Sequence, residues 1–394
     1  MSPTSWRSRP LRERAILAGR EQRTRRAELG DALTELRLLA ETAGATVRGE
    51  VLQRRGPIRA STFLSKGKID EVRTLSGEEQ ATLLLLDDDL SPAQSRNLGE
   101  QLNMKVVDRT GLILDIFSRR ARTREARIQV ELAQLEYLMP RLTRMWEHLS
   151  RLGGGIGTRG PGETQLEVDR RRIRERIAKL RRELERVVKE RRVQRRGRRD
   201  CYKVSLVGYT NAGKSTLFNA LTRASVYVEN QLFATLDPTT RVFPVTRGAK
   251  ALLTDTVGFI RKLPPHLVVS FRATLEEVTE ADLLLHVVDA TEPDIDAHIH
   301  AVETVLEAIG ALGRPRLSIF NKIDAVSDEV SVLGLRARYP GAVFASALTR
   351  EGLPELREAT MRCLLDGARR DGAPTREDGG FGPGSTFGPG STDS

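Results

Sequence analysis

The amino-acid sequence predicts an α/β protein. A doubly wound sheet in its C-terminal half is preceded by a small α/β subdomain and an antiparallel hairpin of two helices. Two observations predict this class. Short apolar runs alternate with helical patterns over residues 29–115 and again after residue 201, as in strand–helix–strand units with parallel strands. The residues in between carry apolar side chains at spacings of three and four, which is typical of amphipathic helices.

Length and composition indicate how many domains the chain forms and what kind of partner it binds. With 394 residues the chain is long enough for two or three domains. Its net charge of +11 favours an anionic partner, nucleic acid first. The two cysteines, Cys201 and Cys363, are too few and too far apart to suggest a disulfide framework or a zinc site. We therefore expect a cytoplasmic protein, and no apolar run is long enough to predict a membrane span.

The first 115 residues divide into an arm and a subdomain. Residues 1–28 are rich in arginine and lack sustained periodicity, so we expect a flexible basic arm. Over residues 29–115 the pattern predicts an α/β subdomain. Its expected strands are 46–51, 82–86 and 105–107, and its expected helices lie near 68–74 and 93–102.

Residues 116–200 are expected to form the helical hairpin. Apolar residues mark one face of each helix: Leu132, Leu135, Met139 and Leu142 on the first, and Ile173, Ile177, Leu180, Leu184 and Val187 on the second. Residues 152–163 are rich in turn formers, and Pro140 is expected to kink the first helix. Two unrelated amphipathic helices, packed on neighbouring domains, are the alternative.

The chain closes with a low-complexity segment. Residues 369–394 include the hexapeptide FGPGST twice. Sequence of this kind buries too little apolar surface to offset its ordering entropy. We expect a disordered tail.

A phosphate-binding loop follows the first apolar run after residue 201. Residues 203–207 are expected to form a strand, and the next residues fit GxxxxGK[ST] at a strand-to-helix junction. The glycines let backbone N–H groups approach phosphates, Lys214 neutralises β and γ oxygens, and the Ser215 hydroxyl can bind Mg²⁺. The predicted nucleotide-binding residues here are Gly208, Tyr209, Thr210, Asn211, Ala212, Gly213, Lys214, Ser215 and Thr216.

Two further segments are predicted to face the phosphates. The sequence DTVG, residues Asp255, Thr256, Val257 and Gly258, ends a predicted strand, where ligands bind open α/β sheets. Upstream lies a predicted switch loop that includes Phe233, Ala234, Thr235, Leu236 and Asp237. A threonine of this loop is expected to bind Mg²⁺ and sense the γ-phosphate. Thr235 is preferred, and Thr239 and Thr240 are alternatives.

The base is predicted from the sequence NKID, residues Asn321, Lys322, Ile323 and Asp324, which follows the predicted strand 317–320. The Asp324 carboxylate can accept from guanine N1 and the exocyclic amine, a donor pair that adenine lacks. Asn321 is expected to brace the loop. Ser346 and Ala347 are expected to offer backbone N–H groups to guanine O6. Residues 201–368 are therefore predicted to form a Ras-like P-loop GTPase domain that binds GTP and GDP with Mg²⁺.

The residue after DTVG is Phe259. Ras-type enzymes place there the glutamine that orients the attacking water. An apolar side chain cannot do so, and no other catalytic residue is predicted. We expect slow unaided hydrolysis, with a partner or another group of the chain replacing the glutamine.

The chain resembles the HflX family over residues 30–365. The resemblance rests on GYTNAGKST at 208–216, FATLDPTTR at 233–241, DTVGFI at 255–260, NKID at 321–324 and the glycine-rich residues 153–163. It implies a GTPase that binds the large ribosomal subunit and its RNA and splits stalled or idle ribosomes. It also implies stimulation of hydrolysis by the ribosome, and Ser215 and Thr235 as Mg²⁺ ligands. Many members carry a small folded domain after the GTPase domain, where this sequence has the low-complexity segment.

The glycine-rich loop is the expected RNA contact, through Gly153, Gly154, Gly155, Gly157 and Arg159. Glycines allow close backbone approach, and nearby arginines supply charge for phosphates. The alternative is a solvated hairpin whose glycines only make the turn. We expect a monomer. Two other functions stay open: an RNA-binding or ribosome-assembly switch with negligible turnover, and an RNA-remodelling ATPase centred on the N-terminal subdomain.

Overall fold

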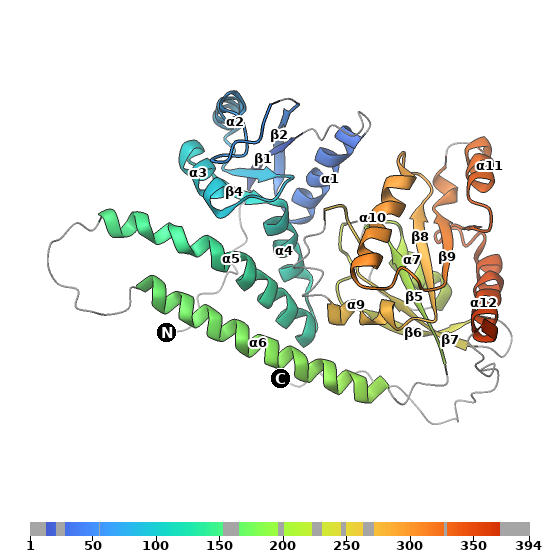
Figure 1. Cartoon of the computed structure of the whole chain (residues 1–394). Helices are drawn as coiled ribbons and strands as arrows, with labels where there is room; N and C mark the ends of the chain where they lie inside the picture. Colours follow the sequence, from blue (N-terminus) through green and yellow to red (C-terminus); the bar gives the residue numbers. More distant parts are fainter. Residues whose placement is uncertain are drawn as a thin grey trace. The chain divides into compact units, whose positions relative to one another are not determined.

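The computed structural model describes residues 13–20, 28–54, 56–152, 165–195, 201–222, 231–245, 250–262, 272–326 and 329–370. They form two compact units (Figure 1). The first comprises Met1–Lys189, Glu229–Asp237 and Lys262–Ala273, and the second comprises Glu190–Val228, Pro238–Arg261 and Thr274–Ser394.

The first unit contains a four-stranded parallel sheet in the order β2-β1-β3-β4. Its strands are β1 (Arg14–Arg20), β2 (Thr46–Gln53), β3 (Leu83–Leu86) and β4 (Lys105–Asp108). The helices that alternate with them are α1 (Glu28–Thr42), α2 (Lys66–Glu79) and α3 (Pro92–Leu102). The α/β subdomain predicted from alternation is thereby confirmed.

Strand β1 corrects one expectation. Residues 1–28 were expected to be a flexible arm, which is wrong for Arg14–Arg20, because this segment lies in the sheet between β2 and β3. Ala15, Ile16, Leu17 and Ala18 have no exposed surface. The apolar run is only four residues long among arginines, so local composition did not reveal it. Its order comes from pairing with strands that lie far along the chain.

Helix α4 (Arg109–Arg120) follows β4 directly and crosses the boundary expected at residue 115. Asp108 caps it, because its Oδ1 atom accepts from the Gly111 N–H at 2.9 Å. Arg109 is buried and forms ion pairs with Glu35 and with Asp87, whose Oδ1 lies 2.6 Å from Nη1. These bonds tie the start of α4 to β3 and α1.

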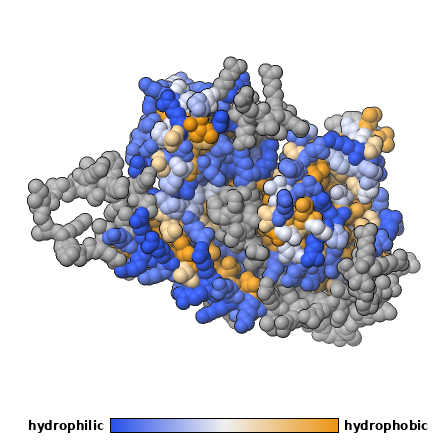
Figure 2. Space-filling view, viewed as in Figure 1, coloured by the Kyte–Doolittle hydropathy of each residue, from blue (hydrophilic) through white to orange (hydrophobic). Residues whose placement is uncertain are grey.

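The two long helices are α5 (Arg124–Leu152) and α6 (Gln165–Arg195), which run in opposite directions (Figure 1). Ile128 and Leu132 of α5 share a buried cluster with Ile177 and Leu180 of α6. The helices therefore pack on each other, which confirms the hairpin over the alternative of two unrelated helices. Pro140 lies inside α5. In the view of Figure 2 hydrophilic residues predominate on the hairpin, with some hydrophobic residues among them.

The second unit is built on a six-stranded sheet in the order β10-β9-β8-β5-β7-β6, in which only β6 is antiparallel to its neighbour. The strands are β5 (Tyr202–Gly208), β6 (Thr239–Pro244), β7 (Lys250–Asp255), β8 (Leu283–Asp289), β9 (Arg316–Asn321) and β10 (Val343–Phe344). The helices are α7 (Lys214–Thr222), α9 (Arg272–Thr279), α10 (Ile295–Ala308), η2 (Ile323–Ala325), α11 (Glu329–Arg338) and α12 (Leu353–Arg370).

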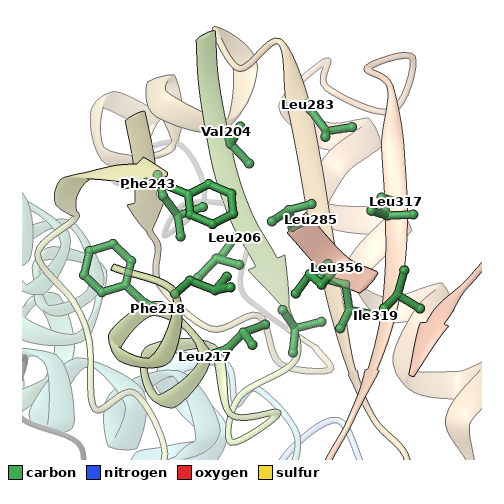
Figure 3. Close-up of a cluster of buried hydrophobic side chains, with 14 of the residues drawn as sticks. Val204, Leu206, Leu217, Phe218, Phe243, Leu283, Leu285, Leu317, Ile319 and Leu356 are labelled. Carbon is green, nitrogen blue, oxygen red and sulfur yellow. The ribbon is translucent and has the colours of Figure 1, made fainter. Parts of the chain in front are cut away.

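The core of this unit holds the central strands in place. Leu206 and Leu285 pack with Leu217 and Phe218 of α7 and with Leu356 of α12 (Figure 3). A second cluster, which includes Val288, Ile295 and Phe320, involves α10. The central strands are mostly apolar, as expected for a parallel sheet covered on two faces, with Ser205 and His286 as buried polar exceptions.

The disordered tail was expected to begin at residue 369. Helix α12 extends to Arg370, so the first two residues of that range are helical. Residues 371–394 lie outside the described part of the chain. Among the helices that the structure describes, none is both long and apolar enough to cross a membrane.

Candidate nucleotide site

The loop between β5 and α7 adopts a conformation that requires glycine at two positions. Gly208 has φ of 156° and Gly213 has φ of 87°. A Cβ atom on Gly208 would collide with the carbonyl oxygen of Val287 in β8. The expected phosphate-binding loop therefore has the geometry that its sequence pattern implies, with α7 beginning directly behind it at Lys214.

Lys214 lies inside this loop. Its Nζ atom donates to the carbonyl oxygens of Gly208, at 3.1 Å, and of Tyr209, at 2.7 Å. The side chain is buried. Burial lowers the pKa of Lys214 to about 8, Asp255 opposes that shift by attraction, and Lys322 adds to it by repulsion. A bound anion such as a nucleotide phosphate would favour the charged form.

Ser215 and Asp255 meet at the mouth of the loop. The Ser215 hydroxyl donates to Asp255 Oδ2 at 2.6 Å. Asp255 has no exposed surface and ends β7 next to β5. Hydroxyl and carboxylate oxygens are ligands of the kind that Mg²⁺ prefers, so the pair fits a magnesium site. The sequence predicted both residues, but only the structure brings them into contact.

The DTVG segment is bonded to the phosphate-binding loop. Phe259 N–H donates to the Gly208 carbonyl at 3.1 Å, and Thr210 N–H donates to the Phe259 carbonyl at 2.7 Å. A Cβ atom on Gly258 would lie 2.9 Å from Thr210 Cα and 3.1 Å from Lys214 Nζ, so glycine is needed there. The Phe259 side chain is 1% exposed. It is therefore packed in the protein interior, as an apolar residue should be.

Asn321 joins the loops predicted to recognise the base to the phosphate-binding loop. Its Nδ2 atom donates to the Ala212 carbonyl at 2.9 Å, and its Oδ1 atom accepts from Ala347 N–H at 3.0 Å. Asn321 is 1% exposed. The expected bracing role is thus visible as two buried hydrogen bonds.

Ser346 and Ala347 use their backbone amides within the protein, and their role toward guanine O6 stays a prediction. Ser346 N–H donates to the Glu351 carbonyl at 3.0 Å, and Ala347 N–H donates to Asn321. Both amides expected to reach guanine O6 are therefore engaged inside the protein. The Ser346 hydroxyl accepts from Thr349 N–H at 3.0 Å, which closes a tight turn.

The other base-recognition residues differ in exposure. Asp324 lies in η2 and is exposed. Lys322, also part of the NKID sequence, pairs with Asp289 Oδ2 at 2.6 Å. Asp289 also accepts from the Thr291 hydroxyl. Sequence reasoning missed Asp289, although it ends the mostly apolar strand β8.

The three candidate threonines of the switch loop lie in different settings. The Thr240 hydroxyl is 2.9 Å from that of Thr254, across the β6–β7 ladder, and Thr239 is opposite Asp255 in that ladder. Thr235 precedes the strand in an irregular segment that groups with the first unit. In that segment the side chains of Phe233 and Leu236 are buried. The Mg²⁺ role of Thr235 stays a prediction.

The side chain of Tyr209 has contacts that the sequence did not suggest. Its hydroxyl accepts from Arg261 N–H at 2.9 Å, and its ring stacks on His298 of α10 with centroids 3.9 Å apart. Tyr209 thereby joins the phosphate-binding loop to the residues that follow DTVG. The GxxxxGK[ST] pattern leaves this position free, and nothing in the sequence marks His298.

The predicted RNA contacts Gly153, Gly154, Gly155, Gly157 and Arg159 lie outside the described residues. What the structure describes is the stem that carries them. On α6, Arg171, Arg172 and Arg174 are exposed.

Three families match consecutive parts of the chain. The family described as GTP-binding GTPase N-terminal matches residues 30–118, and GTP-binding GTPase Middle Region matches residues 120–198. The family described as 50S ribosome-binding GTPase matches residues 203–322. These bounds follow the subdomain, the hairpin and the nucleotide-binding domain in order.

Individual relatives extend the match over most of the chain. The GTPase HflX of Caldanaerobacter subterraneus is 51% identical over 337 residues, which cover 85% of this chain and 77% of that protein. The GTPase HflX of Escherichia coli is 49% identical over 335 residues, covering 84% and 79%. A GTP-binding protein from Sulfolobus solfataricus, solved in complex with GDP, is 26% identical with a TM-score of 0.45, covering 90% of this chain and 99% of that one.

Proposed function

The chain belongs to the HflX family of GTPases, and from that premise we propose that it binds the large ribosomal subunit and splits ribosomes into subunits. It is a GTP-hydrolysing enzyme with a 50S ribosome-binding GTPase domain. The observation that carries the proposal is the joining of a complete GTP site to an arginine-rich hairpin in one chain.

Different residues of the site would bind different parts of GTP. Lys214, held by two loop carbonyls, is placed to exchange them for phosphate oxygens. Asp324, exposed in η2, supplies the carboxylate for guanine N1 and its amine. Asn321 keeps these two loops at a constant separation through its bonds to Ala212 and Ala347.

Magnesium is part of the proposal. Ser215, with Asp255 behind it and Thr235 from the switch loop, would hold the ion. Bound Mg²⁺ neutralises charge on the β and γ phosphates. Ser215 and Asp255 are already within hydrogen-bond distance, so the chain contributes a preformed oxygen pair.

Ribosome-stimulated hydrolysis is proposed because the residue that follows DTVG, Phe259, cannot orient the attacking water. Phe259 is buried and its main chain is bonded to the phosphate-binding loop on both sides. A glutamine at this position would orient water, and a buried phenyl ring cannot. The ribosome would supply or position the missing group.

RNA contact is proposed for the hairpin. The exposed arginines of α6, such as Arg171 and Arg174, can neutralise phosphates of a structured RNA. The paired helices are stiffened by their apolar cluster and by ion pairs such as Arg176 with Glu131 at 2.7 Å. A stiff stem would carry the glycine-rich loop, with Gly153–155, Gly157 and Arg159, into an RNA groove.

The test measures GTP turnover by the full chain alone, with large subunits and with small subunits, at one stated salt concentration. Light scattering of intact ribosomes follows splitting in parallel. We expect strong stimulation by large subunits only, and a fall in scattering that requires GTP. Stimulation without splitting would remove the splitting activity from the proposal.

The alternative is an RNA-binding or ribosome-assembly switch that uses GTP with negligible turnover. Phe259 is equally compatible with it. Binding of GTP-loaded protein to large subunits, with no change in turnover, would replace our proposal by this one.

A further inference from the structure

Residues 231–237, which include the preferred switch threonine Thr235, are packed in the first unit. Leu232, Phe233 and Leu236 are at most 5% exposed. The Phe233 ring meets the Phe117 ring of α4 edge-on, with centroids 4.7 Å apart. The segment is therefore held by an apolar contact with the helix that leads into the hairpin.

Asp237, at the end of this segment, is bound to the start of α5. Its Oδ2 atom accepts from the backbone N–H groups of Arg122, at 3.0 Å, and Thr123, at 3.2 Å. Its Oδ1 atom accepts from the Thr123 hydroxyl. One carboxylate thus receives three donors, all from the two residues that precede the hairpin helix.

Thr123 is also the cap of α5. Its hydroxyl oxygen accepts from Ala126 N–H at 3.1 Å, in the first turn of the helix, while the hydroxyl proton goes to Asp237. A carboxylate at a helix N-terminus is further stabilised by the helix dipole. The order of the first turn of α5 is therefore connected to the position of Asp237.

Lys262, shortly after DTVG, also has a charged side chain bound by residues of the first unit. Lys262 Nζ lies 2.7 Å from Asp87 Oδ2 and 2.8 Å from Asp88 Oδ1, just after β3. Burial acts to lower the pKa of Lys262, but attraction and hydrogen bonds from the two aspartates outweigh it, so the pKa is raised. Lys262, four residues after Gly258, thus has its charged side chain bound within the first unit, to which it belongs.

We propose that Asp237 is a positioning residue, which couples the placement of Thr235, two residues before it, to the capping of α5. The inference rests on the proposed role of residues 231–237 as the nucleotide-sensing segment. In this arrangement the Asp237 carboxylate acts through Arg122 and Thr123. Its carboxylate converts a change in that segment into a change at the base of the hairpin, and the coupling acts equally in the reverse direction.

Hydrogen exchange of the full chain tests the coupling. Amide protection over residues 122–127 is compared between the GDP-bound state and a state with a non-hydrolysable GTP analogue. We expect a difference between these states in the unmodified protein and its loss in Asp237→Ala. Thr123→Val removes the hydroxyl bond from the other side but keeps the two N–H donors, so it should reduce the difference. Thr123→Ser keeps the hydroxyl and should keep the difference.

The ratio of the affinities for the GTP analogue and for GDP is a second measurement. A purely structural role of Asp237 would leave this ratio unchanged. Linkage requires that Asp237→Ala change the ratio of analogue to GDP affinity, by roughly threefold or more. The sign must match the exchange data: if the analogue lowers protection of α5, the ratio rises, and if it raises protection, the ratio falls. Thermal unfolding of each variant shows whether it is folded, and Asp237→Asn, which keeps one acceptor, replaces Asp237→Ala if that variant unfolds.

Three results would overturn the inference. They are equal protection in both nucleotide states, a difference that persists in Asp237→Ala, and equal loss of GDP and analogue affinity without any effect of Thr123→Val. The last would mean that Asp237 contacts the nucleotide directly. Failure of ribosome stimulation would remove the proposed function and leave this coupling intact, since neither measurement here contains ribosomes.

Discussion

Gly213 and Asn321 are in direct van der Waals contact, so that a Cβ atom on Gly213 would collide with Asn321 Nδ2. Gly213 also has φ of 87°, which favours glycine. Because Asn321 bonds both Ala212 and Ala347, this one contact joins three loops of the nucleotide site.

Gly213→Ala should displace Asn321 and weaken nucleotide binding by about 10- to 100-fold, the cost of disturbing one or two buried hydrogen bonds. Fluorescent GDP titration measures the affinity. Gly334→Ala in α11 is the matched control, because nothing lies within 4 Å of its added methyl group. Equal affinities in the two variants would show that the contact is unimportant.

Lys214→Ala should abolish nucleotide-dependent activity. The variant removes the only side-chain cation that the structure places inside the phosphate-binding loop, as judged from the described residues. Equilibrium binding of labelled GTP tests this, and unfolding by denaturant checks that the variant is folded. An affinity like that of the unmodified protein would refute the assignment of this loop.

Asp324→Asn should reduce the preference for guanine. The carboxylate accepts from the exocyclic amine, which inosine nucleotides lack, so the ratio of GTP to ITP affinity should fall by roughly 10-fold or more. Competition titrations with both nucleotides give the ratio. Asp282 lies before β8 and accepts from Lys203 N–H. Asp282→Asn is therefore the control and should leave the ratio unchanged.

Nucleotide binding should take up protons in the range where free Lys214 titrates. With a pKa of about 8 in the free protein, raised by bound phosphates, uptake should grow from roughly 0.1 proton at about pH 7 to roughly 0.8 at about pH 8.5. Because the bound form holds more protons, affinity should fall as pH rises through this window. Calorimetry in buffers of different ionisation enthalpy counts the protons. Zero uptake at the higher pH would contradict the buried setting of Lys214.

Arg109→Ala should destabilise the first unit by about 3–5 kcal/mol, because it leaves the buried Glu35 without this cation and leaves Asp87 with Lys262 alone. Hydrogen exchange of β3 and β4 in the full chain reports the loss in this unit alone. The control is Arg119→Ala, which removes an exposed pair with Asp115 at 2.8 Å and should cost no more than about 0.5 kcal/mol. Similar effects of both variants would contradict a special role for the buried arginine.

Much of the fold and the site follows from local patterns. Spacing of apolar residues predicted the hairpin, and alternation predicted both sheets, because each pattern reflects the period of one element. One prediction failed, where a segment is ordered by distant partners. Arg14–Arg20 was expected to be flexible and is a central strand.

The sequence by itself determined the chemistry of the nucleotide site, since Lys214, Ser215, Asp255 and Asp324 belong to motifs whose residue types are set by phosphate, metal and guanine. The tertiary structure alone decided which of these groups touch, as Ser215 does Asp255. It also decided that Asp237 binds the two residues that precede α5. The physical reason is range: a motif needs only neighbours along the chain, whereas these contacts join residues that lie 40 to 115 positions apart.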